Sequence, residues 1–250
     1  MQERDIEEYR VRLERIMVSP TLNTSFTHFV RMGVGPIYDR YRLQHYPGRF
    51  IDDILPEEDF GMEQFVGARA FVNLQAVSTP VNPRIGLRWL NEFSYNQQIG
   101  GEGRKFGRLG SEFIFYIDPR LPFQLTLAGR LGGAHNIGDF TIYQANTLGG
   151  LSNLRGYRRT RFAGRTSVYQ NTEIRAELFK FNVYLFPGKL GIMGLVDHGR
   201  VWADGESSNK IHRGVGGGIW IDVLKQAVIN ATYSVGEEDK LFNLNFGFLF

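Results

Sequence analysis

Apolar and polar side chains alternate along most of the chain from about residue 24 onward. In the stretch 65–76 the even positions from Val66 to Ala76 are all apolar, whereas the odd positions include Arg69 and Asn73. Successive side chains of a β-strand point to opposite faces, so this period of two predicts strands with one apolar and one polar face. The same alternation predicts further strands within residues 85–93, 112–118, 123–131 and 168–178.

The two faces of these predicted strands indicate what surrounds them. The apolar faces contain large aromatic residues such as Trp89 and Phe113, and the polar faces contain both charge signs in mid-strand, as at Glu112 and Arg130. A soluble β-sandwich also alternates, with its apolar face in the core. Runs of roughly ten residues, with aromatic residues on one face and charges toward a water-filled or plugged lumen, favour a transmembrane β-barrel.

Turn-type segments rich in Gly, Pro, Asn and Asp separate the alternating runs. We therefore expect an all-β fold, an antiparallel transmembrane β-barrel with about 10 to 12 strands in this chain. An even number of strands would close the barrel. The expected strands centre near residues 28, 39, 70, 88, 113, 127, 142, 173, 195, 216, 230 and 245, and the pattern is weakest near 39 and 142.

The first 20 residues fit two patterns. Ile6, Tyr9 and Leu13 share one face of a helix with Ile16, but Tyr9 and Leu13 also alternate with charges as in a strand. We favour a helix, because charged helix-forming residues dominate and Ser19-Pro20 would end it. The predicted organisation is a linker or helix over residues 1–20 and one β-barrel domain over residues 21–250.

Composition agrees with this prediction. The 250 residues include 30 glycines, 20 phenylalanines and 11 tyrosines, so 30/250 or 12% is glycine, against roughly 7% in average proteins. Tight turns and aromatic girdles of a transmembrane barrel use these residues. No apolar run reaches 18 residues, which excludes a transmembrane helix, and the lack of cysteine excludes disulfides and Cys-ligated metals.

The residues do not indicate an enzyme or a nucleic-acid binder. The five histidines lack zinc-binding spacing, and neighbours His198 and Asp197 would point to opposite faces of a strand. The arginine-rich segment 155–165 contains one RGY and no repeated RGG or stacking aromatics, and the net charge is only +3. We expect no catalytic residue, no metal, no cofactor and no nucleic-acid partner.

The last ten residues, LFNLNFGFLF, alternate to the end. This run resembles the C-terminal targeting signal of bacterial outer-membrane barrels, which end on Phe. As the last strand of a barrel, its apolar face would point toward lipid. The residues of that face are Phe242, Leu244, Phe246, Phe248 and Phe250.

Two motifs precede this strand. The first is LRGY, residues 154–157, and the second is LVDHG, residues 195–199. With the Phe-terminated strand, their order and spacing resemble those of the BamA/TamA family of outer-membrane assembly proteins, the bacterial surface antigen superfamily. In that family the RG(F/Y) motif lies on a loop folded into the barrel, and the second motif, FxDxG, lies on a strand; here Leu195 replaces its Phe. The wider sequence is most similar to a subgroup whose barrels follow other domains, some of them phosphoesterases.

The resemblance implies a role for Arg155, which would pair with Asp197 across the lumen and latch the loop to the wall. Glu173 lies one strand earlier and is also expected to face inward, so it is a candidate second acceptor. Gly156, Tyr157 and Gly199 complete the two motifs. The resemblance also implies the bacterial outer membrane as location. The implied partners are outer-membrane lipid, lipopolysaccharide and unfolded outer-membrane proteins.

The implied function is assembly or translocation of outer-membrane proteins. The alternative is a barrel that anchors, or forms an export pore for, an upstream domain such as a phosphoesterase, without insertase activity. Family barrels have sixteen strands, which need more than 250 residues. The chain is therefore expected to be the C-terminal part of such a barrel, or a smaller barrel, or one completed by another chain.

Overall fold

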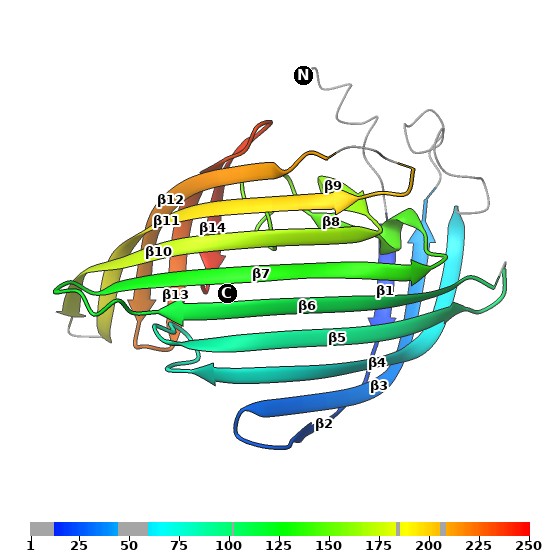
Figure 1. The fold of residues 1–250 in the computed structure, drawn as a ribbon, viewed down its shortest axis with the longest axis horizontal. Helices are drawn as coiled ribbons and strands as arrows, with labels where there is room; N and C mark the ends of the chain where they lie inside the picture. Colours follow the sequence, from blue (N-terminus) through cyan, green and yellow to red (C-terminus); the bar gives the residue numbers. More distant parts are fainter. Residues whose placement is uncertain (1–12, 45–59, 102, 184–185, 206–208) are drawn as a thin grey trace.

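The computed structural model of the protein describes residues 13–44, 60–101, 103–183, 186–205 and 209–250, and antiparallel strands dominate it (Figure 1). Twelve strands form one sheet, and two short strands form a second. The strands of the large sheet are β1 (Leu13–Val18), β2 (Leu22–Ser25), β3 (Val30–Leu43), β4 (Gly61–Val77), β5 (Gly86–Gln98), β6 (Lys105–Ile117), β7 (Leu125–Gly138), β10 (Thr166–Val183), β11 (Phe186–Trp202), β12 (His212–Val223), β13 (Ala227–Val235) and β14 (Lys240–Phe246).

From β3 onward, chain neighbours in the large sheet are also sheet neighbours, because the order runs from β3 to β7 and then from β10 to β14. β1 and β2 both pair with β3, so together they line one edge of the sheet. The connection between β7 and β10 contains the 3₁₀ helix η3 (Ile142–Gln144) and the paired strands β8 (Asn146–Leu148) and β9 (Phe162–Gly164). This is the longest fully described connection, and it positions the candidate site.

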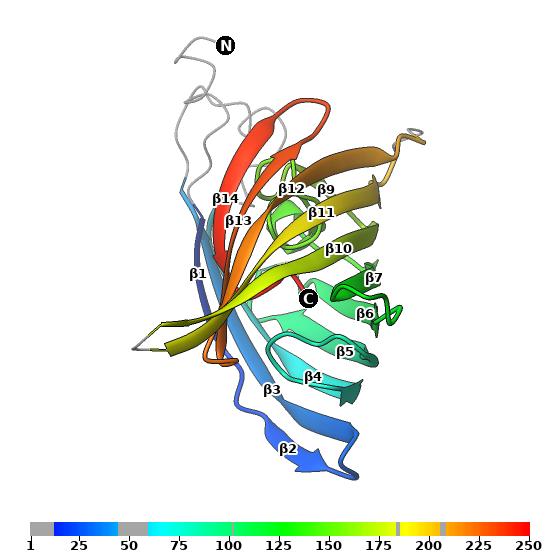
Figure 2. The same cartoon turned by 90° about the vertical axis from the view of Figure 1, so that its left-hand side faces the viewer.

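The sheet curls strongly, and Figure 2 shows β1 and β14 on the same side of the molecule. Within the described residues β1 pairs only with β3 and β14 only with β13. The fold is therefore all-β, antiparallel and barrel-like, as predicted, but the sheet is not closed. An even number of strands did not close it.

The two faces of the sheet differ as the alternation predicts. The convex face exposes large apolar side chains, among them Trp89, Phe113 and Phe242. The concave face buries charged ones, and Glu173 and Asp197 are 0% exposed. Among the described residues, no helix is long and apolar enough to cross a lipid bilayer.

The expected helix within residues 1–20 is wrong for its second half. Residues 13–18 form β1, which pairs in register with β3 from Leu43 to Tyr38. Arg15 reaches across this pairing to Asp39 at 2.6 Å, so tertiary contacts outweigh helix propensity. The sheet thus starts before residue 21. Residues 1–12 lie outside the described residues.

Two of the expected strand centres are also wrong. Residue 28 lies in the bend between β2 and β3, and residue 142 begins η3. The expected strand near residue 39, with its weak pattern, is confirmed as β3. The connections between strands gather at two opposite ends of the sheet. The turn end has the connections β4–β5, β6–β7 and β12–β13, and the loop end has β5–β6, β7–β10, β11–β12 and β13–β14.

Candidate functional site

The connection 139–165 lies on the concave side of the sheet, where Figure 2 shows it enclosed by the curl of the strands. Its apolar residues Leu148, Leu154 and Tyr157 are at most 1% exposed and pack with Tyr169 of β10. Polar contacts fix its backbone, since the Asn136 amide of β7 donates to the Gln144 carbonyl at 3.0 Å. The loop therefore folds inward because it has its own small apolar core to bury against the sheet.

Arg155 connects the tip of this loop to two strands. Its Nε and Nη2 donate to the two carboxylate oxygens of Asp197 on β11, both at 2.7 Å, and its backbone N–H donates to the same carboxylate at 2.9 Å. Its Nη1 pairs with Glu173 on β10. The predicted contacts of Arg155 with Asp197 and Glu173 are thus present, and the pair with Asp197 is bidentate, the strongest and most directional form of this interaction.

Burial sets the electrostatics of this cluster. Arg155 is 3% exposed and both carboxylates are fully buried. Burial alone would lower the pKa of the Arg155 guanidinium, but the hydrogen bond to Asp197 and the negative charge of Glu173 outweigh it and raise that pKa above its usual range. The arginine stays protonated, so the loop is held by a permanently charged group.

The two residues after Arg155 fit between loop and wall. Gly156 has φ +93°, a left-handed conformation that favours glycine, and it lies against Gly236. The Tyr157 hydroxyl donates to the Arg213 carbonyl and accepts from the Glu237 N–H, both at 3.2 Å. A Cβ on Gly214 of β12 would collide with the Arg155 carbonyl oxygen. The RGY motif therefore needs its own Gly156 and also glycines in the facing wall, Gly214 and Gly236, where a side chain would collide with the loop.

Arg175 extends the cluster toward the chain end. Its Nε and Nη2 donate to Glu173 at 2.8 and 2.6 Å, and Nη2 also donates to the Phe250 carbonyl at 3.0 Å. Glu173 therefore joins Arg155 to Arg175. Arg175 was not predicted as part of the site, although the sequence carries a signal for it, because residues 173 and 175 of a strand share a face.

Arg130 of β7 makes a parallel set of contacts. Its guanidinium donates to Asn171 at 2.9 and 2.8 Å and to the Ser152 carbonyl at 2.6 Å. The Asn171 amide in turn donates to the Asn153 carbonyl at 2.8 Å. The loop is thus bound to β7 and β10 as well as to β11. The position of Arg130 on a polar strand face was visible in the sequence, but its loop partners were not.

The other residues expected at the site are placed as follows. Gly199 lies on β11 two residues after Asp197 and faces Leu148 of the loop. The remaining loop arginines are more exposed, and among them Arg161 pairs with Glu238 at 2.6 Å and Arg165 with Asp204 at 2.5 Å near the loop end. Of the arginines in this segment, Arg155 is therefore the one that binds Asp197 and Glu173 and acts as the predicted latch.

The last strand differs from its prediction. Phe242, Leu244 and Phe246 are 71%, 63% and 78% exposed on the outer face, as expected. β14 ends at Phe246, and at Gly247, with φ +89°, the chain turns inward. Phe248 packs on Trp220 inside the lumen, and Phe250 is 8% exposed beside Tyr116. The prediction that Phe248 and Phe250 share the outer face is wrong, because the glycine breaks the strand.

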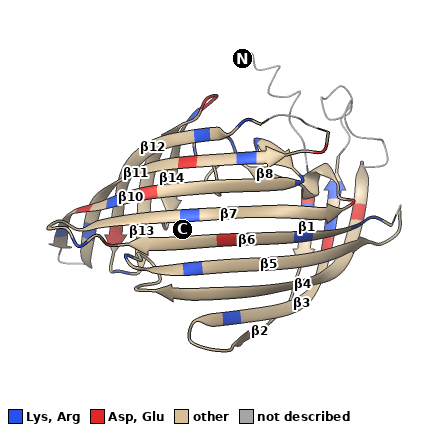
Figure 3. Ribbon diagram, in the orientation of Figure 1, with Lys and Arg blue, Asp and Glu red and all other residues tan. Residues whose placement is uncertain are grey.

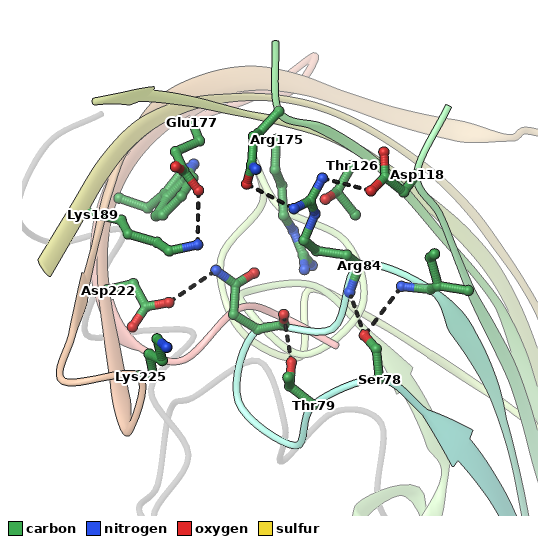
Figure 4. A pocket seen from close by; sticks show the side chains of 14 residues that line it. Ser78, Thr79, Arg84, Asp118, Thr126, Arg175, Glu177, Lys189, Asp222 and Lys225 are labelled. Carbon is green, nitrogen blue, oxygen red and sulfur yellow. Dashed lines mark hydrogen bonds and ion pairs between the residues drawn. The ribbon is translucent and has the colours of Figure 1, made fainter. Parts of the chain in front are cut away.

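Charged residues lie in the middle of the strands as well as at their ends (Figure 3). At the turn end, the β4–β5 connection folds across the lumen and helps to line a cavity of about 380 Å³. Figure 4 shows side chains converging on it from this connection and from the wall. Most of its charges are paired, with Arg84 to Asp118 at 2.5 Å and Lys189 to Glu177 at 2.8 Å.

Within the part of the chain that the structure describes, no group of three or more His, Cys, Asp or Glu side chains is arranged to hold a metal ion. A scan against protein-family models finds no match to the chain, and a search of curated proteins finds none either.

Proposed function

We propose that the protein is a β-barrel of the bacterial outer membrane, of the BamA/TamA type, that assists the assembly or translocation of outer-membrane proteins. The observation that carries this proposal is the inward loop held by Arg155 against Asp197 and Glu173. A large loop fixed inside a curled sheet through an arginine at its tip matches the arrangement that the RGY and LVDHG motifs imply.

The outer face supports a membrane location. Outward residues nearest the turn end are apolar, such as Leu87, Ile117 and Phe246, and they are 42% to 78% exposed. Outward residues near the loop end include cations on several strands: Arg40, Arg42, Lys105, Arg200 and Arg213. An apolar band below a basic rim suits a bilayer whose outer surface carries phosphate groups, such as those of lipopolysaccharide.

The two edges support a role in assembly. β1 and β14 each have one sheet partner within the described residues, so their outer edges offer backbone N–H and C=O groups. An incoming strand could pair with such an edge by β-augmentation. Unpaired edges are not tolerated in lipid, so they must be covered by another segment until a client strand arrives.

The test is assembly of an unfolded outer-membrane barrel protein by the reconstituted chain. Proteoliposomes containing the protein should fold this reporter faster than empty liposomes, measured by heat-modifiable migration on gels. Arg155→Ala should slow folding at least fivefold, whereas Arg158→Ala, which removes a 62% exposed loop arginine, should change it less than twofold.

Equal reporter folding in wild-type proteoliposomes and empty liposomes would contradict the assembly role and favour the anchor role for an upstream domain. Full activity of Arg155→Ala would contradict the role of the loop. The two outcomes separate the barrel's activity from the contribution of its latch.

A further inference from the structure

The lumen contains a site that the chain fills with its own last residues. At Gly247 the chain leaves the edge of the sheet, and the Gly247 N–H donates to the Val228 carbonyl at 2.7 Å. Phe248 then packs edge-on against Trp220, with ring centroids 5.7 Å apart, and lies 3.7 Å from the guanidinium carbon of Arg175. Phe250 packs on Ile114, Tyr116 and Ala128. Two aromatic residues, two positions apart, thus occupy adjoining subsites.

The site recognises backbone as well as rings. Arg175 Nη2 donates to the main-chain oxygen of Phe250 at 3.0 Å, and the guanidinium groups of Arg130 and Arg175 lie 5.3 and 5.6 Å from the Phe250 ring. Cations over ring faces and donors to a carbonyl suit a peptide that carries aromatic side chains.

The cavity of about 380 Å³ at the turn end adjoins this site, because Arg175 and Trp220 line both. Two buried polar atoms of its lining lack a hydrogen-bond partner among the described residues, Arg175 Nη1 and Asp222 Oδ1. Their residues are 2% and 4% exposed. A donor and an acceptor left unpaired in one cavity match the C=O and N–H groups of a polypeptide backbone.

The charges of the cavity argue for a polypeptide over an anionic ligand. Arg84 and Lys189 are already paired with Asp118 and Glu177. Asp222 accepts from the Asn82 amide at 3.2 Å, so its second oxygen would repel a phosphate. An extended chain presents every second side chain on one side, which is the spacing of Phe248 and Phe250.

We propose that the cavity and the adjoining aromatic site form one binding site for an extended segment of another protein with aromatic residues at positions i and i+2. Residues 248–250 occupy the inner part of this site, and the incoming segment displaces them. This inference rests on the proposed function, since it assigns a feature of the client protein that the barrel would handle.

The probe is a fluorescein-labelled peptide LNFGFLF, residues 244–250, titrated with the full chain in detergent micelles and followed by fluorescence anisotropy. Phe248→Ser/Phe250→Ser empties the site and should bind the probe at least tenfold more tightly than the wild type does. Phe246→Ser, which changes an outward residue of the same segment, should bind as the wild type does. The peptide LNFGSLS and empty micelles report non-specific association.

Asp222→Asn tests the cavity without touching the aromatic subsites. It keeps an oxygen for Asn82 and replaces the unpaired acceptor with an amide donor, so in the emptied variant it should weaken probe binding at least fivefold. Heat-modifiable migration shows that each variant is folded. If the double variant does not fold, Phe250→Ala is used, with an expected threefold gain in affinity.

The proposal is overturned if the emptied variant binds LNFGFLF no more tightly than the wild type does, or binds LNFGSLS equally well. Unchanged binding by Asp222→Asn overturns the inclusion of the cavity. Tight, sequence-selective peptide binding without any reporter assembly would contradict the proposed function and leave this site intact. Reporter assembly without peptide binding would contradict the site alone.

Discussion

Replacing Arg155 with alanine is the most informative perturbation of the candidate site. The change removes three hydrogen bonds from the side chain and leaves Asp197 and Glu173 buried, both at 0% exposure. Removing one partner of a buried ion pair costs about 3–5 kcal/mol, because the remaining charge is uncompensated. Two carboxylates lose a partner here, although Glu173 retains Arg175, so we expect about 4 kcal/mol, roughly a thousandfold in the unfolding constant.

The measurement is equilibrium unfolding by guanidinium chloride in detergent micelles, followed by tryptophan fluorescence. Arg158→Ala is the matched control and should change the free energy of unfolding by less than about 1 kcal/mol, since exposed ion pairs contribute little. Adding Asp197→Asn to Arg155→Ala should recover about 1–3 kcal/mol by removing one of the unpaired buried charges. If Arg155→Ala unfolds like Arg158→Ala, or if Asp197→Asn destabilises it further, the buried-charge argument is refuted.

Three further changes test other contacts. Gly214→Val puts a side chain where the Arg155 carbonyl lies, so the loop must shift, and protease accessibility of residues 150–160 should increase while the barrel remains heat-modifiable; an unchanged cleavage pattern would show that the wall is not closely packed there. Phe250→Ala removes a buried ring and should cost about 3–5 kcal/mol of unfolding free energy, whereas Phe246→Ala, on the exposed face, should cost under about 1 kcal/mol in micelles. The hydrogen bond from Arg165 lowers the pKa of Asp204 below the unfolded value of roughly 3.9, so the ion pair persists as the pH falls past that value and is lost only at lower pH. An NMR titration of the Asp204 carboxyl should therefore show a midpoint below that unfolded value, and Arg165→Gln should raise the midpoint.

The alternation in the sequence predicted the strands well because one physical cause produces it. A strand with an apolar outer face and a polar inner face must alternate, and β4, β6 and β10 do so over most of their length, with exceptions such as the inward Phe65 and Ile114. Residues 13–18 were mispredicted because an edge strand with charged residues has no such constraint. Its conformation depends on pairing with β3 and on the contact of Arg15 with Asp39.

The candidate site was predictable as far as its residues face one another across the lumen. Arg155, Asp197 and Glu173 could be placed together from motif order and from the polar faces of their strands. The contacts of Arg130 and Arg175 with residues 248–250 were not predicted, since they depend on the chain turning inward at Gly247. A glycine within an alternating run is a known signal for a break, and it preceded both phenylalanines that turned out to face inward.

The loop and the last residues are parts of one lumenal structure. Glu173 accepts from both Arg155 and Arg175, and Arg175 donates to the Phe250 carbonyl. Arg130 similarly joins the Ser152 carbonyl of the loop to the Phe250 ring. Glu173 is 0% exposed, so moving either guanidinium away from it leaves a buried carboxylate with one partner fewer, which is energetically costly. The loop and residues 248–250 are linked through these shared contacts, so their movements are coupled, and occupancy of the peptide site at the turn end can influence the latch near the loop end.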